Sequence, residues 1–195
     1  MSLASLSIIP VVLIGVTSVF ILVSQNWRTS ILALALQYLA VFWLVGLVWP
    51  LGLAAVKLVA GWIAGAVMSV SRADISSFED SNPAISVVMF RVIAAGLVLV
   101  MVVSILPQAA VFLPVQPPVL EGGIILIGIG LLQLGMSVHP LRIVMGLLTV
   151  LSGFELVYAG VETSILVAGL QALVTLGVAL GGAYLLAAGL MEETR

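Results

Sequence analysis

Two ionisable side chains lie inside long apolar segments of this chain, and they are the strongest candidates for a chemical role. Lys57 is flanked by leucine, valine and alanine, and Glu155 lies in a comparable segment near the other end of the sequence. A charge at the centre of a bilayer costs on the order of 3 kcal/mol on insertion scales, so each of these residues requires a partner or a role. A lysine next to a glutamate can exchange a proton with it, or can form a fixed ion pair with it.

Two glutamines accompany the charged residues. Gln171 lies at a similar depth in its own apolar segment, whereas Gln37 lies nearer the middle of another. We expect Lys57, Glu155 and Gln171 to face one another inside a helix bundle. They would form either a step of a buried proton relay or an ion pair whose free hydrogen-bond sites are filled by an amide, which would specify helix packing.

The composition indicates that the chain lies in lipid rather than in water. Of 195 residues 63% are hydrophobic and only 7% are charged, which excludes an ordinary water-soluble domain. With six basic residues and a net charge of −2, the chain lacks the positively charged surface that is typical of nucleic-acid-binding proteins. With no cysteine and one histidine, His139, the chain offers no disulfide and no set of His and Cys ligands for a transition metal.

The apolar segments predict an all-α, polytopic membrane helix bundle that forms a single domain over residues 1–195. They are too long and too uniformly apolar for barrel strands, and helices are the other structure that can span lipid. Breaks at proline, glycine, asparagine and charged residues predict seven spans, at 5–24, 30–49, 51–70, 85–106, 120–138, 141–160 and 163–188.

The basic residues predict how these spans are oriented. Arg28, Arg72, Arg142 and Arg195 all fall on one face of a seven-span protein, and the loops of the other face contain no lysine or arginine. By the positive-inside rule, we expect the N-terminus outside and the C-terminus in the cytoplasm. Arg91, near the cytoplasmic start of the fourth span, can extend its long side chain towards the same face.

Smaller features have simple structural interpretations. His139 precedes Pro140 in a short turn, where we expect it to be solvated. Trp49 lies near the end of a span, as do Trp27 and Tyr158, which is typical of an interfacial aromatic belt. Glycine pairs at 61 and 65 and at 177 and 181 have the spacing that allows close helix approach.

The last three spans resemble the small three-helix subunit of complex I and its antiporter relatives. In that subunit a glutamate lies inside the second helix, and here the segment Leu151–Val157 carries Glu155 after the basic turn that contains Arg142. The chain as a whole resembles a longer relative, component E of hydrogenase-4 and formate hydrogenlyase membrane arms. Residues 1–106 would then form a four-helix part, and 120–190 the unit similar to complex I.

Polar positions in the N-terminal half carry the same resemblance. Arg28 precedes Gln37 by nine residues, Lys57 falls where component E has a lone intramembrane lysine, and Arg72 ends that helix. The chain departs from the family in having Gln171 where the last helix normally carries an acidic residue. Glu155 also lies about one turn later than the family's acidic position.

The resemblance implies a subunit of a membrane complex in a prokaryotic cytoplasmic membrane. Such a subunit would bridge antiporter-like neighbours and line part of a proton path through Lys57 and Glu155. The sequence has no nucleophile and base pattern, Walker loop, dinucleotide fingerprint or haem ligand set. We therefore expect no catalytic site and no cofactor in this chain, and any redox cofactors of an oxidoreductase complex would belong to its partners.

Two alternatives come from other classes of protein. One is a non-catalytic scaffold subunit of an unrelated membrane assembly, in which Lys57 and Glu155 only hold helices together. The other is a small independent channel or transporter, which is disfavoured because neither a broken-helix pair nor an inverted repeat is visible.

Overall fold

The computed structural model describes residues 3–73 and 85–193, and it consists of helices joined by short turns. Seven helices follow one another along the chain, as the apolar segments predict. Their bounds are α1 Leu3–Val23, α2 Trp27–Val45, α3 Leu51–Ala73, α4 Ile85–Phe112, α5 Pro117–Gly135, α6 Pro140–Ala159 and α7 Ile165–Glu193. Six of them, α2 to α7, are long and apolar enough to cross a membrane, whereas the apolar part described for α1, Ser7–Val23, is shorter. The protein is therefore a helical integral membrane protein.

Helix ends follow from local chemistry. Asn26 caps α2, because its side chain accepts a hydrogen bond from the Arg28 amide at 3.0 Å. Pro117 and Pro140 each occupy a first-turn position of a helix, where a missing N–H costs nothing. His139 precedes Pro140 as the N-cap residue of α6, and it is exposed in the turn, as expected.

The helix ends differ from the predicted boundaries by up to six residues. The largest difference is in the fourth span, which is predicted to end at residue 106, before Pro107, whereas α4 continues through that proline to Phe112. Proline is tolerated inside a membrane helix because neighbouring groups and local adjustments can satisfy the backbone carbonyl that it leaves unpaired.

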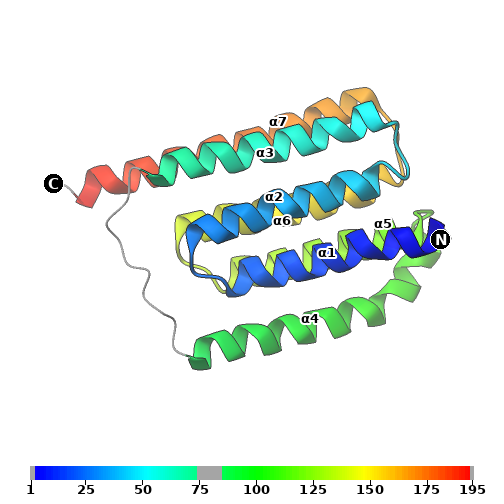
Figure 1. Ribbon diagram of the computed structural model, residues 1–195, viewed down its shortest axis with the longest axis horizontal. Coiled ribbons are helices and arrows are strands. Elements are labelled where there is room, and N and C mark those ends of the chain that lie inside the picture. Colours follow the sequence, from blue (N-terminus) through cyan, green and yellow to red (C-terminus); the bar gives the residue numbers. More distant parts are fainter. Residues whose placement is uncertain (1–2, 74–84, 194–195) are drawn as a thin grey trace.

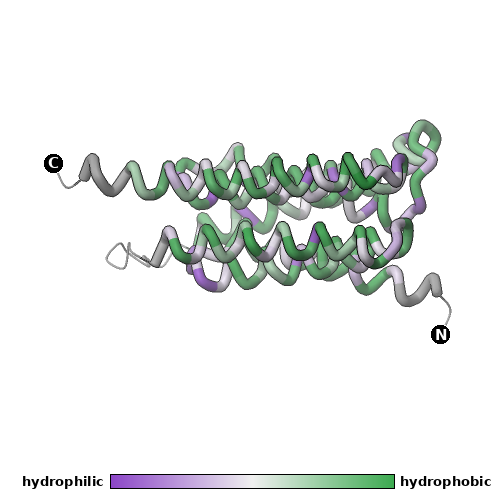
Figure 2. Tube along the Cα trace, turned by 90° about the horizontal axis from the view of Figure 1, so that it is seen from above, coloured by the Kyte–Doolittle hydropathy of each residue, from purple (hydrophilic) through white to green (hydrophobic). Residues whose placement is uncertain are grey.

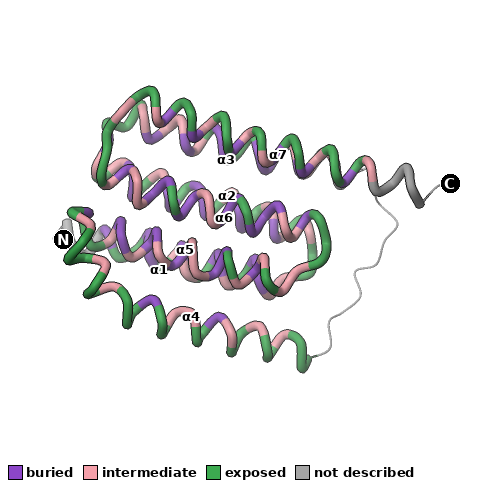
Figure 3. Tube along the Cα trace, turned by 180° about the vertical axis from the view of Figure 1, so that it is seen from behind, coloured by how far each residue is buried: buried purple, intermediate pink, exposed green. Residues whose placement is uncertain are grey.

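The helices form two layers of three, with α4 at one edge. Figure 1 shows α1, α2 and α3 side by side in front of α5, α6 and α7, and Figure 2 shows the two layers from above. Helix α1 packs on α5, α2 on α6 and α3 on α7. Helices α2 and α6 are central and much of each is buried, whereas α4 buries only Ala95 and Val102 (Figure 3).

The two layers are parallel copies of one three-helix unit. Helices α5, α6 and α7 begin 114, 113 and 114 residues after α1, α2 and α3. The stacked partners also run in the same direction through the bundle (Figure 1). The two layers are therefore not related by an inverted repeat, which is the relation expected for a transporter. Helix α4 connects the two units.

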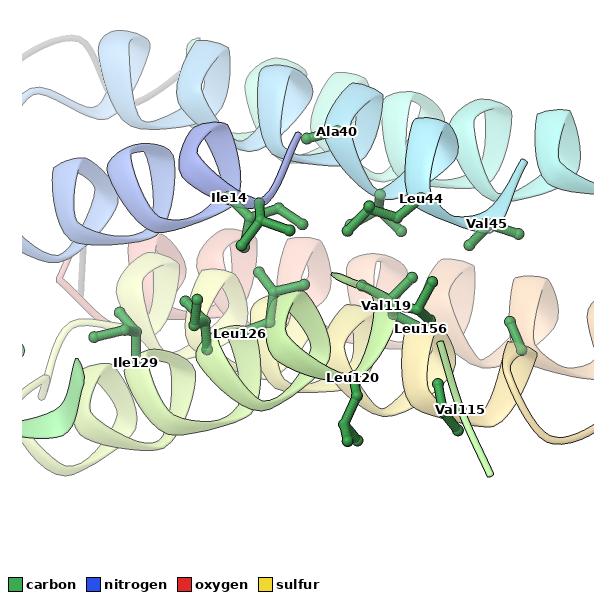
Figure 4. Close-up of a cluster of buried hydrophobic side chains, with 14 of the residues drawn as sticks. Ile14, Ala40, Leu44, Val45, Val115, Val119, Leu120, Leu126, Ile129 and Leu156 are labelled. Atoms are coloured by element: carbon green, nitrogen blue, oxygen red, sulfur yellow. The ribbon is translucent and has the colours of Figure 1, made fainter. Parts of the chain in front are cut away.

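Apolar packing holds the layers together. Ile14 of α1, Leu44 of α2, Leu126 of α5 and Leu156 of α6 are fully buried in one cluster, seen in Figure 4. Within the second layer, α5 and α6 approach closely through glycine. A Cβ on Gly153 of α6 would lie 2.7 Å from a backbone oxygen of α5, so only glycine fits there.

The glycine pairs noted in the sequence differ from each other in the structure. A Cβ on Gly61 would lie 2.2 Å from the ring of Tyr38, so this glycine allows α2 and α3 to pack closely. Gly177 and Gly181 have nothing within 4 Å of that position, so they form no close helix contact with the residues that the structure describes.

Candidate functional site

Lys57 and Glu155 form an ion pair in the interior of the bundle. Lys57 Nζ of α3 lies 2.9 Å from Glu155 Oε2 of α6, and the two side chains are only 1% and 2% exposed. Lys57 is the seventh residue of α3, so at a rise of about 1.5 Å per residue it lies about 9 Å below the start of that helix. This pair joins the central helix of one layer to an outer helix of the other.

The structure confirms that Gln171 belongs to the same group. Lys57 Nζ donates a hydrogen bond to Gln171 Oε1, which α7 brings to the pair from its seventh residue. The separation of Lys57 and Gln171 in sequence is 114 residues, so they occupy equivalent positions in the two three-helix units. The repeat therefore places a lysine and a glutamine against each other across the interface between the layers.

Thr175 completes the surroundings of the carboxylate. Its hydroxyl donates to Glu155 Oε1 at 2.9 Å, from one turn beyond Gln171 on α7. Each carboxylate oxygen of Glu155 thus has its own partner. The one sequence signal for Thr175 is its position four residues after Gln171, which places both on one face of a helix.

Trp49 lies against the same pair, and the expectation that it belongs to an interfacial belt is wrong. Its side chain is buried, and its Nε1 donates to the carbonyl oxygens of Ala159 at 2.9 Å and Glu162 at 3.1 Å. Lys57 Nζ lies 5.9 Å from the centre of the ring, within the range of a cation–π contact. Trp49 therefore ties the turn between α2 and α3 to the end of α6, and it contacts the ammonium group from that side.

Gln37 belongs to a second polar group, deeper in the bundle. Gln37 Nε2 of α2 donates to Thr149 Oγ1 of α6 at 3.4 Å, and Ser18 Oγ of α1 donates to Gln37 Oε1 at 3.3 Å. Gln37 forms no hydrogen bond with Lys57 or Glu155, so it is not a fourth member of the ion-pair group.

Tyr38 and Ser152 lie between the two groups. Tyr38 follows Gln37 on α2, Ser152 is one turn from both Thr149 and Glu155 on α6, and both side chains are buried. These residues join the two groups into one set, here called the polar row, that crosses the bundle from α7 to α1. Its members are all at most 7% exposed: Gln171, Thr175, Lys57, Glu155, Ser152, Tyr38, Thr149, Gln37 and Ser18.

Two atoms of the polar row have unused hydrogen-bonding capacity. Tyr38 Oη and Gln171 Nε2 are buried and have no hydrogen-bond partner of normal geometry. Buried polar groups in native proteins are nearly always satisfied, so these two atoms are exceptions within the row.

The part of the chain that the structure describes contains no group of three or more His, Cys, Asp or Glu residues that could hold a metal ion. The chemistry of the site is therefore that of one acid and base pair among amides and hydroxyls. No family model, curated protein or solved structure matches this chain.

Proposed function

We propose that this chain is a membrane-arm subunit of a multi-subunit complex similar to complex I or a group 4 hydrogenase, and that its polar row forms part of a proton path between neighbouring subunits. The observation that carries the proposal is the Lys57–Glu155 pair, a buried acid and base at 2.9 Å. An intramembrane ionisable pair is by default a candidate for a proton relay.

The geometry of the pair suits proton exchange. Transfer of one proton from Lys57 Nζ to Glu155 Oε2 converts the ion pair into an amine and a carboxylic acid. The net charge of the pair is zero in both states. The distance is within the range for direct transfer between an acid and a base. Gln171 and Thr175 hold the two groups in place in both states, because each accepts from or donates to one of them.

The direction of the polar row supports a role between subunits. The row runs from the edge formed by α3 and α7, across α6 and α2, to Ser18 of α1. This direction runs across the helices rather than along them, which suits a path that leads from one subunit towards another. In the proposed complex, the N-terminus lies outside a prokaryotic cytoplasmic membrane and the C-terminus in the cytoplasm. Any redox cofactors belong to partner subunits.

A purely structural role is the second candidate, and a specific observation favours it. Both oxygens of the Glu155 carboxylate and the ammonium group of Lys57 have partners, as in an ion pair that only specifies helix packing. In that case the chain is a scaffold subunit of a membrane assembly, and proton transfer is not part of its work.

One experiment separates the two candidates. The native assembly is isolated from membranes in mild detergent, its proteins are identified by mass spectrometry, and proton translocation is measured after reconstitution with wild type, Glu155→Gln and Glu162→Gln. Glu162 is exposed in the loop after α6, so Glu162→Gln is the matched control. A proton path predicts that Glu155→Gln assembles with antiporter-like and redox subunits but translocates protons poorly, while the control behaves as wild type.

Other outcomes would contradict the proton path. If Glu155→Gln prevents assembly, and any complex that does form translocates protons normally, the pair is structural. If wild-type protein co-purifies with no antiporter-like or redox subunit, the membrane-arm assignment itself fails.

A further inference from the structure

Two arginines converge on the end of α1, at the opposite end of the bundle from Trp49. Arg91 Nη1 of α4 donates to the carbonyl oxygen of Leu22 at 3.3 Å, and Arg142 Nη1 of α6 donates to the same oxygen at 3.4 Å. Arg142 Nη2 also donates to the carbonyl oxygen of Ser24. Two helices distant in sequence, α4 and α6, thus bring their guanidinium groups to one place, the turn between α1 and α2.

This arrangement brings two positive charges together. The two guanidinium groups are neighbours, because both donate to the one carbonyl oxygen of Leu22. Among the side chains that the structure describes, neither arginine forms an ion pair with a carboxylate. The C-terminus of a helix supplies roughly half a negative charge, so α1 offsets only about a quarter of the two positive charges.

Both arginines also have spare hydrogen-bond donors. A guanidinium group carries five N–H donors, whereas Arg91 forms one hydrogen bond and Arg142 forms two with the described residues. Both side chains are half-buried, so part of each group is accessible from outside the bundle. Gln133 of α5 donates to the carbonyl oxygen of Arg142 at 3.0 Å, which fixes the first turn of α6 beside that helix.

We propose that Arg91 and Arg142 bind a phosphate group at this end of the bundle. Paired guanidinium groups match the geometry and charge of phosphate, with several charge-assisted hydrogen bonds at once. The site lies beside the turns after α1 and α5, at one end of the bundle. Basic pockets between membrane helices bind the head groups of anionic lipids, so a phospholipid is one source of the phosphate and free phosphate is the other.

Native mass spectrometry of the full chain in detergent tests this site. Phosphatidylglycerol is titrated into wild type, Arg91→Gln, Arg142→Gln and Arg28→Gln. Arg28 is the matched control, because it is exposed at the same end of the bundle and its guanidinium contacts the Trp27 ring. We expect Arg91→Gln and Arg142→Gln to weaken lipid binding by about tenfold or more, since each loses charge-assisted hydrogen bonds, and Arg28→Gln to bind as wild type.

Competition identifies the source of the phosphate. If excess inorganic phosphate leaves the bound phosphatidylglycerol in place, the site takes a lipid head group; if it displaces the lipid, the site takes free phosphate. Arg91 forms only one hydrogen bond within the chain, so Arg91→Gln is expected to fold even if Arg142→Gln does not. Lipid binding by folded Arg91→Gln equal to that of wild type would overturn the proposal, as would an equal loss in Arg28→Gln.

Discussion

The two members of the buried ion pair are energetically coupled, so removing both should cost less than the sum of the costs of removing each one. Lys57→Met leaves the Glu155 carboxylate in the interior with the Thr175 hydroxyl as its remaining partner. Breaking a buried pair in this way costs about 3–5 kcal/mol, because an uncompensated charge remains. Glu155→Gln leaves the Lys57 ammonium with Gln171 Oε1, the Trp49 ring and the new amide oxygen.

The magnitudes follow from these remaining partners. Glu155→Gln should cost about 1.5–3 kcal/mol, less than Lys57→Met, because hydrogen bonds to the charged group persist. The double variant has no buried charge at this site, so its cost should fall short of the sum of the two single costs by about 2 kcal/mol or more. The structure thus predicts both an order for the single variants and a sign for their coupling.

Reversible unfolding in mixed detergent micelles, followed by tryptophan fluorescence, gives the free energies of unfolding for this cycle. Glu162→Gln removes an exposed carboxylate and should change the free energy by no more than about 0.5 kcal/mol. Single costs that add to the cost of the double variant within that margin would show that the two side chains do not interact in the folded protein. A larger cost for Glu155→Gln than for Lys57→Met would contradict the partners assigned to each group.

Three further predictions concern the packing around the pair. Gly153→Ala should lower the melting temperature, because its Cβ would lie 2.7 Å from a backbone oxygen of α5, whereas Gly177→Ala, with open space, should not. Trp49→Phe keeps a ring near the ammonium but loses two hydrogen bonds, so it should reduce the free energy of unfolding by about 1–3 kcal/mol in a chemical denaturation series. Since the chain has no cysteine, Thr175→Cys should resist a membrane-permeant maleimide in the folded state, whereas Glu162→Cys, exposed in the loop after α6, should react; equally rapid labelling of Thr175→Cys would place Thr175 outside the bundle.

The fold could be predicted largely from hydropathy, because lipid allows few alternatives. Apolar segments must form helices, and polar breaks must lie between them. One exception is Pro107. The sequence predicts a helix end before this residue, yet α4 continues through it, since a membrane helix tolerates proline more readily than a soluble one.

The candidate site could be predicted only in part. The cost of an unpaired charge in lipid made Lys57 and Glu155 predictable as partners, and depth alone suggested Gln171. The positions of Tyr38 and Trp49 depend on the rotation of each helix about its axis, which hydropathy does not fix in a chain that is apolar on nearly every side. A tryptophan near a span end is typical of an interface, and only the packing of α6 shows that Trp49 is buried instead.

The parallel repeat explains why so asymmetric a site can exist in so regular a bundle. Equivalent positions of the two units face each other across the layer interface, as Lys57 and Gln171 do. With identical residues at both positions, two lysines would repel each other in the interior and two glutamines would leave Glu155 without a cation. A lysine on one side and a glutamine on the other place one positive charge at the interface, and Glu155 of the second unit neutralises it. The repeated backbone therefore supplies a close contact between α3 and α7, while the differences between the two copies supply the chemistry.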